Sequence, residues 1–262
     1  METVRSMENL IIQMIIKDYT DLFLSNSEIS KKYNIHRMDV QKILKNNKID
    51  LRKKTPKIKV DHNFFGEYNP YSCYWAGFIL ADGYVRTEKR NLLCIKLSIK
   101  DISHLEKFKE IIKFEGKIEK KENFCRISIS SKKIIEDLDK NFSICANKTF
   151  IAQINNKIPK KYLNHFIRGY MDGDGTLTRS SCETLGFLGT MKTLEYIRDF
   201  FYHSGIKLRS KEKPQICKNG KIFGVSYYGK SAISCCEVLY KGSGEKIRLD
   251  RKFNIFKKWK IK

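Results

Sequence analysis

The chain has 262 residues, of which 41% are hydrophobic and 12% aromatic, so it can bury one or two cores and is not a wholly disordered polypeptide. Its length predicts about two domains. The 52 Lys and Arg side chains outnumber the 29 Asp and Glu, and the net charge of +23 favours a polyanionic partner, nucleic acid before an acidic membrane. Codon bias in an AT-rich gene would enrich Asp and Glu together with Lys, so it does not explain the shortage of acids.

Membrane, zinc and disulfide classes are excluded by the sequence. No run approaches the roughly 20 apolar residues of a membrane span, and the N-terminal stretch has no signal-peptide core, so we expect an intracellular protein with no membrane partner. The eight cysteines include no CxxC pair, only the vicinal Cys235 and Cys236, and the five histidines show no HExxH spacing. We therefore expect reduced cysteines that serve as packing residues.

Residues 1–52 are predicted to form a small helical unit. Its first helix carries an apolar stripe, and a short second helix begins with Ser27 as its N-terminal cap and directs Ile29 inward. A turn at Asn34 and Ile35 leads to a third helix. The apolar positions at helical spacing are Leu10, Ile11, Met14 and Ile15 in the first helix and Val40, Ile43 and Leu44 in the third.

The segment SEISKKYNIHRMDVQKILKNNKI resembles the helix-turn-helix of resolvase-type and related bacterial DNA-binding domains. The resemblance implies that the third helix enters a major groove, and it favours a bacterial or phage source, with the protein in the cytoplasm or nucleoid. A helical bundle with a solvated basic face would share the same apolar skeleton and stays open as an alternative. The side chains implied to contact DNA are His36, Arg37, Gln41 and Lys42, with Asp39 beside them.

A repeat dominates the rest of the chain. Residues 53–64 are predicted to be a basic linker, because RKKTPKIKV is rich in Lys, broken by a proline and poor in apolar residues. Beyond it, WAGFILADGYV begins at Trp75 and IRGYMDGDGTL begins at Ile167, and each copy precedes a hairpin-like stretch and an amphipathic helix. We therefore predict two halves, 65–155 and 156–262, each with the order helix, two strands, helix, two strands, helix.

The strands of these halves alternate apolar and polar residues, as CIKLSIK and CRISIS show, which is typical of half-buried antiparallel strands. Each sheet would then offer one polar and basic face to a partner. The residues expected to face inward are Ile95, Leu97, Ile99, Ile127 and Ile129. The outward residues, predicted to contact DNA, are Lys96, Ser98, Lys100, Arg126 and Ser128.

The two repeated motifs are predicted to be helices that pack against each other. Gly77 and Ala81 in the first, and Gly169 and Gly173 in the second, are small residues four apart, so they share one helix face and let two backbones approach closely. Each helix ends in an aspartate followed by a glycine, and that glycine is expected to stop the helix in a left-handed conformation.

The two terminal aspartates, Asp82 and Asp174, point to chemistry. A carboxylate at a helix C-terminus opposes the macrodipole, and a local rule broken at the same place in both copies marks a functional site. Parallel helices would bring the two carboxylates side by side, where a divalent cation relieves their repulsion; hard oxygen ligands suit Mg²⁺. Such a pair near a phosphate groove predicts metal-assisted phosphodiester hydrolysis. Asp172 has no acidic counterpart, since Leu80 stands in the first copy, and is expected either to support the metal-binding residues from behind or to be structural.

WAGFILADG (75–83) and IRGYMDGDG (167–175) resemble the paired motifs of the LAGLIDADG homing endonucleases. The resemblance covers roughly residues 65–260. It implies a single-chain enzyme in which Asp82 and Asp174 bind the catalytic metal ions, while antiparallel sheets read the major groove and both strands are cut across the minor groove. It further implies a lysine beyond each half's last helix. The similar positions are Lys148 and Lys252, which could polarise water or stabilise developing charge; solvated phosphate contacts are an equal alternative for both.

These patterns together predict an α+β protein: two pseudo-symmetric αββαββα units packed through the motif helices, preceded by a small all-α helix-turn-helix domain. The expected function is site-specific, Mg²⁺-dependent cleavage of double-stranded DNA by a monomer at a long asymmetric target. Two alternatives stay open, an intron RNA maturase and a non-catalytic DNA-binding regulator on the same scaffold. Because the chain starts at Met1 and ends WKIK, without splicing blocks, we expect a free-standing or intron-encoded protein.

Overall fold

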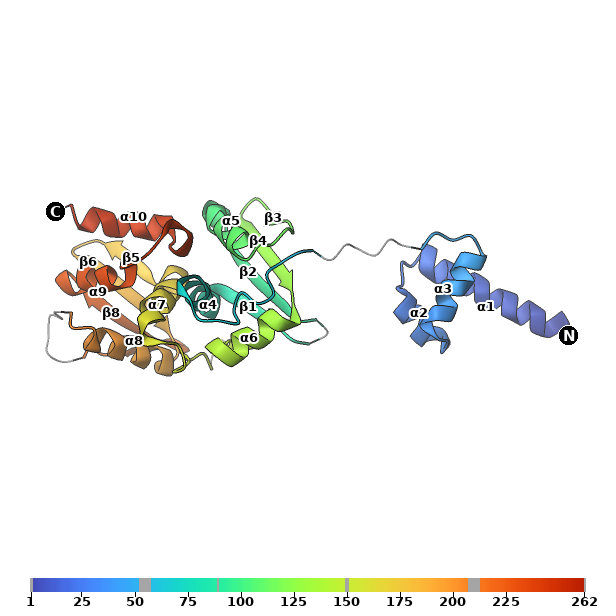
Figure 1. Cartoon of the computed structure of the whole chain (residues 1–262), viewed down its shortest axis with the longest axis horizontal. Helices are drawn as coiled ribbons and strands as arrows, with labels where there is room; N and C mark the ends of the chain where they lie inside the picture. Colours follow the sequence, from blue (N-terminus) through green and yellow to red (C-terminus); the bar gives the residue numbers. More distant parts are fainter. Residues whose placement is uncertain (1, 52–57, 89, 149–150, 207–212, 262) are drawn as a thin grey trace. The chain divides into compact units, whose positions relative to one another are not determined.

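The computed structural model describes residues 2–51, 58–88, 90–148, 151–206 and 213–261, the side chains of 2–8 excepted. It divides into two compact units, Met1–Lys57 and Ile58–Lys262 (Figure 1). Within the described residues, no helix is both long and apolar enough to cross a bilayer. Of the predicted linker, residues 53–57 lie outside the description. The rest, 58–64, belongs to the second unit instead, because the main chain at Asp61 donates to Ile112 O at 2.8 Å.

The first unit is a bundle of α1 (Glu2–Thr20), α2 (Asn26–Tyr33) and α3 (Arg37–Asn46). Helix α2 begins two residues before the position expected. Ser25, rather than Ser27, is its cap: Ser25 Oγ accepts from Glu28 N at 3.3 Å, and Ser25 N donates to Glu28 Oε2 at 2.8 Å. Asn34 ends this helix in the left-handed region, which gives the expected turn. The buried side chains are Ile15, Tyr19, Ile29, Val40 and Leu44.

The apolar stripe predicted on the first helix is buried at one of its four positions. Ile15 is fully buried, whereas Leu10, Ile11 and Met14 are 62%, 45% and 45% exposed. Length explains the difference, because a helix of 19 residues extends about 28 Å while its partners of 8 and 10 residues extend about 12 to 15 Å. Among the side chains of α1 that the structure describes, those near its C-terminal end, such as Ile15 and Tyr19, are the buried ones.

The second unit has the predicted order of elements in both halves. The first half comprises α4 (Pro70–Asp82), β1 (Gly83–Arg86), β2 (Leu92–Ser98), the 3₁₀ turn η1 (Ile99–Asp101), α5 (Ile102–Ile111), β3 (Glu119–Lys120), β4 (Phe124–Ser130) and α6 (Lys132–Phe142). The second comprises α7 (Lys160–Asp174), β5 (Thr176–Arg179), β6 (Glu183–Gly189), α8 (Met191–His203), β7 (Cys217–Asn219), β8 (Ile222–Tyr228) and α9 (Lys230–Tyr240). Two elements follow that were not predicted, the 3₁₀ turn η3 (Glu245–Ile247) and α10 (Asp250–Trp259).

Each half folds one antiparallel four-stranded sheet, with strand order β1-β2-β4-β3 in the first and β5-β6-β8-β7 in the second. The alternation predicted for the strands is present, since Ile95, Leu97, Ile127 and Ile129 are buried. It ends two residues earlier than expected, because Ser98 caps the 3₁₀ turn with its side chain. Ile99 and Lys100 therefore lie in that turn and not on the strand.

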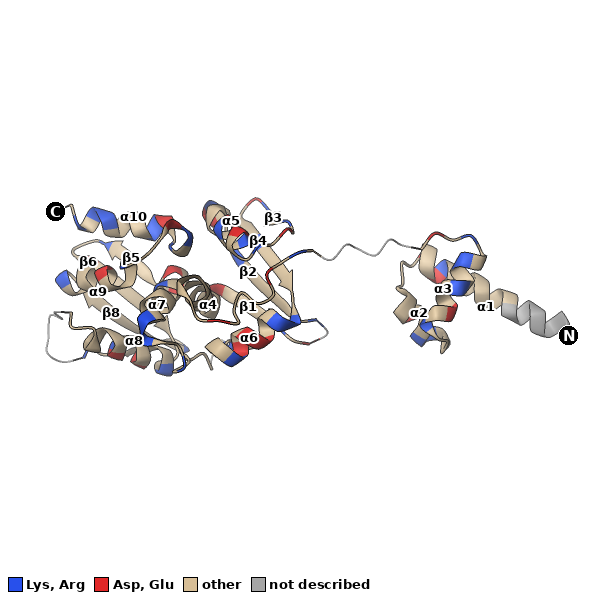
Figure 2. Ribbon diagram, viewed as in Figure 1, with Lys and Arg blue, Asp and Glu red and all other residues tan. Residues whose placement is uncertain are grey.

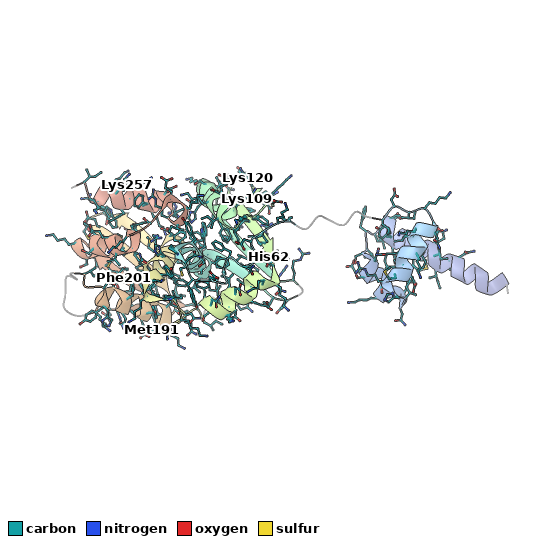
Figure 3. The ribbon with its side chains drawn as sticks, viewed as in Figure 1. His62, Lys109, Lys120, Met191, Phe201 and Lys257 are labelled. Atoms are coloured by element: carbon teal, nitrogen blue, oxygen red, sulfur yellow. The ribbon has the colours of Figure 1, made fainter. Side chains whose placement is uncertain are left out.

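One continuous core fills the space between the sheets and the helices, and Figure 3 shows how its side chains interlock, with Phe201 of α8 fully buried. Helices α5 and α6 cover the inner face of the first sheet, and α8 and α9 cover that of the second. All eight cysteines are free. Packing was expected for all of them, but Cys94 is half-buried and Cys217 exposed, because both lie on the uncovered sheet faces.

Candidate active site at the ends of the paired helices

The two motif helices, α4 and α7, lie side by side at the centre of the second unit (Figure 1). Asn69 starts α4 by accepting hydrogen bonds from Tyr71 N and Ser72 N, both at 2.9 Å, and Pro70 occupies the first turn, where no donor is needed. The stretch from Ser72 to Leu80 is buried on every side, as expected for a helix that is apolar all round.

Glycine allows the two backbones to touch. A Cβ added at Gly77 would lie 1.9 Å from Phe166 O, and one added at Gly169 would lie 1.9 Å from Tyr74 O. About one turn closer to the C-terminal ends of the helices, a Cβ at Gly173 would lie 2.4 Å from the Cβ of Ala81. The four small residues expected at this interface thus form the reciprocal contact that their spacing predicts. This contact fixes the two helix ends beside each other.

Both helices end without the left-handed glycine that the sequence suggested. Gly83 has φ −79° and ψ 150°, and Gly175 has φ −81° and ψ 158°, so each continues directly into an extended segment. Glycine is needed there for space, because a Cβ would meet Ile79 O at 2.7 Å in one case and Met171 O at 2.5 Å in the other. Each motif aspartate therefore lies at the sharp junction of a helix and a strand.

Asp82 and Asp174 are brought together at these junctions. Oδ2 of Asp82 lies only 3.4 Å from where a Cβ of Gly173 would stand. Both carboxylates reach solvent, yet protein surrounds each on most sides, and this partial burial raises both pKa values. The pKa of Asp82 rises to about 6, first through burial and second through the negative charge of Asp174. The site therefore brings two carboxylates close together in a partly buried place, with the positive charges of Lys252 and Lys148 acting on both.

Lys148 and Lys252 are also brought to this place, each at the end of one motif helix. Lys148 Nζ donates to Leu80 O at 2.6 Å and Ala81 O at 3.3 Å. Lys252 Nζ has four carbonyl acceptors, at 2.6, 2.9, 3.3 and 2.6 Å, in Met171, Asp172, Gly173 and Gly175. Both lysines are buried, and burial lowers their pKa values, that of Lys252 to about 8.

These lysines offset the unfavourable placement of the two aspartates at the helix C-termini. The last carbonyls of a helix have no partner within the helix, and a cation there complements the macrodipole that the aspartates oppose. Sequence reasoning proposed a catalytic role for Lys148 and Lys252 and did not foresee that they cap the motif helices. The arrangement gives a cluster of two carboxylates and two ammonium groups at one junction.

Two buried charged residues of the second motif, Asp172 and Arg168, contact the C-terminal segment. The sequence analysis did not predict these contacts. Asp172 accepts from Tyr74 OH at 2.7 Å and from Leu249 N at 2.8 Å, and burial raises its pKa. Arg168 donates to Ile247 O at 2.8 Å and also to Leu239 O. Together they attach the segment that leads into α10, which carries Lys252. The signal was present, because the first copy of the motif has the uncharged Ala76 and Leu80 at the matching positions.

The predicted DNA-contacting residues of the first sheet lie on its open face, the face not covered by helices. Lys96 and Arg126 are opposite each other on β2 and β4, and Ser128 lies one pair further along. Lys96 Nζ lies 4.1 Å over the ring of Phe124, and Arg126 Nε donates to Glu119 Oε2 at 2.8 Å. Ser98 and Lys100 are exposed at the end of β2 and in the turn after it.

The predicted contacts of the first unit gather around the start of α3. His36 caps this helix, since its Nδ1 accepts from Met38 N at 3.3 Å. Arg37 and Lys42 are exposed and Gln41 is half-buried, and Lys42 lies 3.7 Å from Asp39. These side chains therefore share one surface of the unit, although His36 is partly engaged in holding the helix.

Comparison with solved structures identifies proteins of similar fold. I-GzeII, a LAGLIDADG homing endonuclease in complex with its DNA target, gives a TM-score of 0.50 at 16% identity, covering 74% of this chain and 89% of that chain. I-SmaMI bound to cleaved DNA gives 0.48 at 16% identity, with 74% and 88% covered. I-AabMI bound to uncleaved DNA gives 0.46 at 14% identity, with 74% and 92% covered. No protein-family model and no curated protein matches the sequence. Likeness at this identity concerns the fold alone.

Proposed function

We propose that this chain, which has the fold of the LAGLIDADG homing endonucleases, is a site-specific endonuclease that hydrolyses both strands of a DNA duplex in a divalent-metal-dependent reaction. One observation carries the proposal. Asp82 and Asp174, the last residues of two helices from the two repeats, meet at a single junction although 91 residues separate them in the chain. A fold alone does not imply an activity, whereas this site supplies the chemistry.

The donors at the junction fit magnesium. Within the described residues, no group of three or more His, Cys, Asp or Glu side chains forms a metal cluster. Magnesium in phosphoryl-transfer sites is characteristically held by one or two carboxylates, with water and substrate phosphate completing the shell. Asp82 and Asp174 provide those carboxylates, and burial together with the charge of Asp174 raises the pKa of Asp82 although Lys252 and Lys148 act against the rise. A bound dication would add positive charge and favour the ionised form of both.

In the reaction we assign the chain's own residues as follows. Asp82 and Asp174 would hold the metal, which when bound activates a water molecule and stabilises the leaving oxygen. Lys148 and Lys252 keep the two helix ends fixed through the main-chain carbonyls and place positive charge beside the phosphate that reacts. The raised pKa of Asp82 means that the free site gains full metal affinity only above about pH 6.

The two sheets supply the duplex-binding surface in this proposal. The open face of the first sheet carries the side chains that sequence analysis selected, namely Lys96, Ser98, Arg126 and Ser128, with Lys100 at the margin. The first unit would add a second contact through His36, Arg37, Gln41 and Lys42. Because one chain provides both aspartates and both sheets, a monomer suffices, and the differing sheets favour a long asymmetric target.

The alternatives predict different substrates. An intron RNA maturase would bind folded RNA, and a regulator would bind duplex DNA without cutting it. The presence of both aspartates in one junction favours the nuclease over the regulator. Purified protein incubated with a randomised duplex library and Mg²⁺, followed by sequencing of the ends, tests the proposal. We expect ends that share one long sequence. Bound but uncut duplex would support the regulator, and binding of intron RNA without cut DNA would support the maturase.

A further inference from the structure

The hydrogen-bond register aligns the two sheets residue by residue. Tyr84 and Thr176 each follow the motif aspartate by two residues, and their cross-strand partners are Cys94 and Gly186. From these pairs, every position on one open face has a counterpart on the other. Directly opposed residues of antiparallel strands share one face, so each row across β2, β4 and β3 corresponds to a row across β6, β8 and β7.

One row of the first sheet is charged. Lys96 on β2 lies opposite Arg126 on β4, which lies opposite Glu119 on β3. The two cations are held in place, Lys96 by the ring of Phe124 at 4.1 Å and Arg126 by its ion pair with Glu119. Such a row presents several N–H donors from the two central strands and one carboxylate from the edge strand β3.

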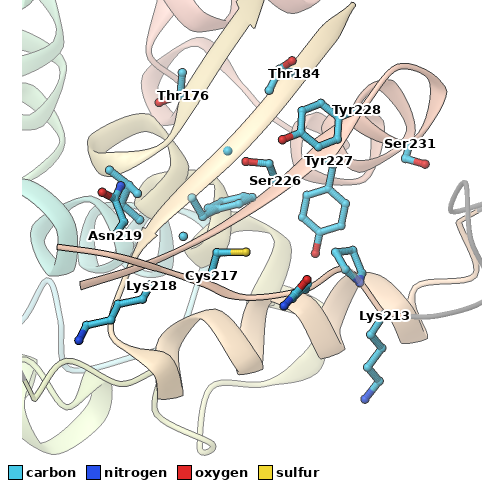
Figure 4. A pocket seen from close by; sticks show the side chains of 16 residues that line it. Thr176, Thr184, Lys213, Cys217, Lys218, Asn219, Ser226, Tyr227, Tyr228 and Ser231 are labelled. Atoms are coloured by element: carbon cyan, nitrogen blue, oxygen red, sulfur yellow. The ribbon is translucent and has the colours of Figure 1, made fainter. Parts of the chain in front are cut away.

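The equivalent row of the second sheet has no charge. It consists of Leu188, opposite Gly224, opposite Cys217. The ribbon of β6 and β8 is almost entirely free of charged residues (Figure 2). A concavity of about 920 Å³ lies over this row, and Figure 4 shows its floor of small and hydroxyl-bearing side chains. The lysines of this concavity, Lys213 and Lys218, point away from that floor (Figure 4).

The two rows suit different base pairs. In the major groove, Arg and Lys donate to O6 and N7 of guanine and Glu accepts from N4 of cytosine, whereas apolar side chains contact the methyl group of thymine. Gly224 and the half-buried Leu188 give an uncharged, apolar surface that could contact that methyl group, and they pack closely, since a Cβ at Gly224 would lie 3.3 Å from Leu188 Cδ2. A cation in the same row would place a charge on this surface.

We infer that the row of Lys96, Arg126 and Glu119 reads a G·C pair in one half of the target, and that the row of Leu188, Gly224 and Cys217 reads an A·T pair at the symmetry-related position of the other half. The inference rests on the proposed function only in so far as duplex DNA is the ligand. A neighbouring row serves as an internal reference, since Ser128 and Ser226 occupy equivalent positions and should impose similar preferences in both halves.

Binding selection tests the inference independently of cleavage. The full chain is incubated with a randomised duplex library in Ca²⁺, bound duplexes are recovered, and base frequencies are compared at symmetry-related positions. The wild-type chain should select G·C in one arm and A·T at the mirrored position in the other. The variant Lys96→Met/Arg126→Gln should lose its preference for G·C by about tenfold or more in one arm and leave the other arm unchanged.

Two further variants keep the test decisive. Lys132→Met/Lys140→Met removes two exposed charges from α6, which covers the opposite side of the first sheet, and should change neither arm. Leu188→Lys should convert the preference for A·T in the second arm toward G·C. The same base pair in both arms, a G·C preference that survives Lys96→Met/Arg126→Gln, or no selected duplex at all would overturn the inference. Selected arms as expected, with no cleavage in Mg²⁺, would uphold it and reject the nuclease.

Discussion

The two halves of the second unit are alike where they meet and unlike where they face outward. At the shared interface, α4 and α7 use matching glycines, end in matching aspartates and are capped by matching lysines. On the open sheet faces, the charged row at Arg126 has an uncharged counterpart at Gly224. The helix ends proposed for chemistry are thus built alike in both halves, whereas the sheet faces proposed to contact DNA differ. Symmetric cleavage of an asymmetric site would need this combination.

Substitution of the matching glycines at the interface of α4 and α7 should have the largest effect on stability. Gly77→Ala and Gly169→Ala each place a methyl group 1.9 Å from a carbonyl oxygen of the other helix, so we expect each to cost about 3 kcal/mol or more, enough to prevent stable folding. Urea unfolding followed by circular dichroism measures this cost. Gly244→Ala is the control, because nothing lies within 4 Å of a Cβ there. Tolerance of alanine at either motif glycine would show that the two helices do not touch closely.

The two lysine caps differ in how many carbonyl groups accept from them, so their removal should destabilise the two halves to different extents. Lys252→Met removes a donor from four carbonyl groups, of which that of Met171 keeps its bond from Gly175 N, and Lys148→Met removes a donor from two. Buried acceptors left without partners are costly, so we expect a loss of about 3 to 5 kcal/mol for Lys252→Met and about 1 to 2 kcal/mol for Lys148→Met. Chemical denaturation with Lys140→Met as the exposed control measures both. Equal losses would mean that the cap of the second half is no stronger than that of the first.

The first unit should affect affinity rather than cleavage. A chain beginning at Ile58 keeps both motif helices and the whole second unit. We expect it to cut its target but to bind about tenfold more weakly at moderate salt. The slope of log affinity against log salt should become shallower by about 0.9 for each DNA phosphate that the first unit would otherwise neutralise. Fluorescence anisotropy across a salt series measures this. An unchanged slope would mean that residues 1–57 bind something other than DNA.

The smallest effect expected is on thermal stability. The folded-state pKa of Asp82 is raised from 3.8 to about 6, so the folded protein holds this proton more tightly than the unfolded chain. Stability from this group is therefore complete below pH 3.8 and is lost as the pH rises through 6. Asp82→Asn removes the loss, so its Tm should exceed that of the wild type by a few degrees at pH 8, roughly 2 to 4 °C for each kcal/mol, and should approach it near pH 4. Calorimetry with Mg²⁺ omitted measures the difference, and a lower Tm for Asp82→Asn at pH 8 would contradict it.

Local sequence patterns predicted much of this fold because each pattern depends on residues that are close together in the sequence. Alternation identified β2 and β4, and the paired small residues identified the close approach of the two helices at Gly77 and Gly169. The prediction was wrong where a neighbour decides the conformation. Gly83 avoids a clash with Ile79 O instead of adopting a left-handed turn, and Ser98 ends its strand by capping the next turn.

The contacts that Lys252 and Asp172 make with main-chain groups of other elements could not be predicted from one sequence. Lys252 was selected by resemblance, but that its ammonium group meets the carbonyl of Gly175 depends on how α10 returns to α7. Likewise, Leu249 N was not identifiable as a donor to Asp172, since main-chain groups leave no mark in the sequence. Of these two partners, only Asp172 was recognisable in the sequence, as a charged residue within an apolar motif.

The central claim is that aspartates from both halves form one cleavage site, and the most direct measurement compares Asp82→Asn and Asp174→Asn on a cognate duplex. Each substitution removes one charged oxygen ligand and nearly preserves size. We expect both variants to bind the duplex in Ca²⁺ like the wild type and to cut it in Mg²⁺ at least about 100-fold more slowly, because a site metal contributes several kcal/mol to such reactions. Asp139→Asn, on the exposed surface of α6, should cut normally. Full cleavage by either Asp82→Asn or Asp174→Asn would contradict the claim.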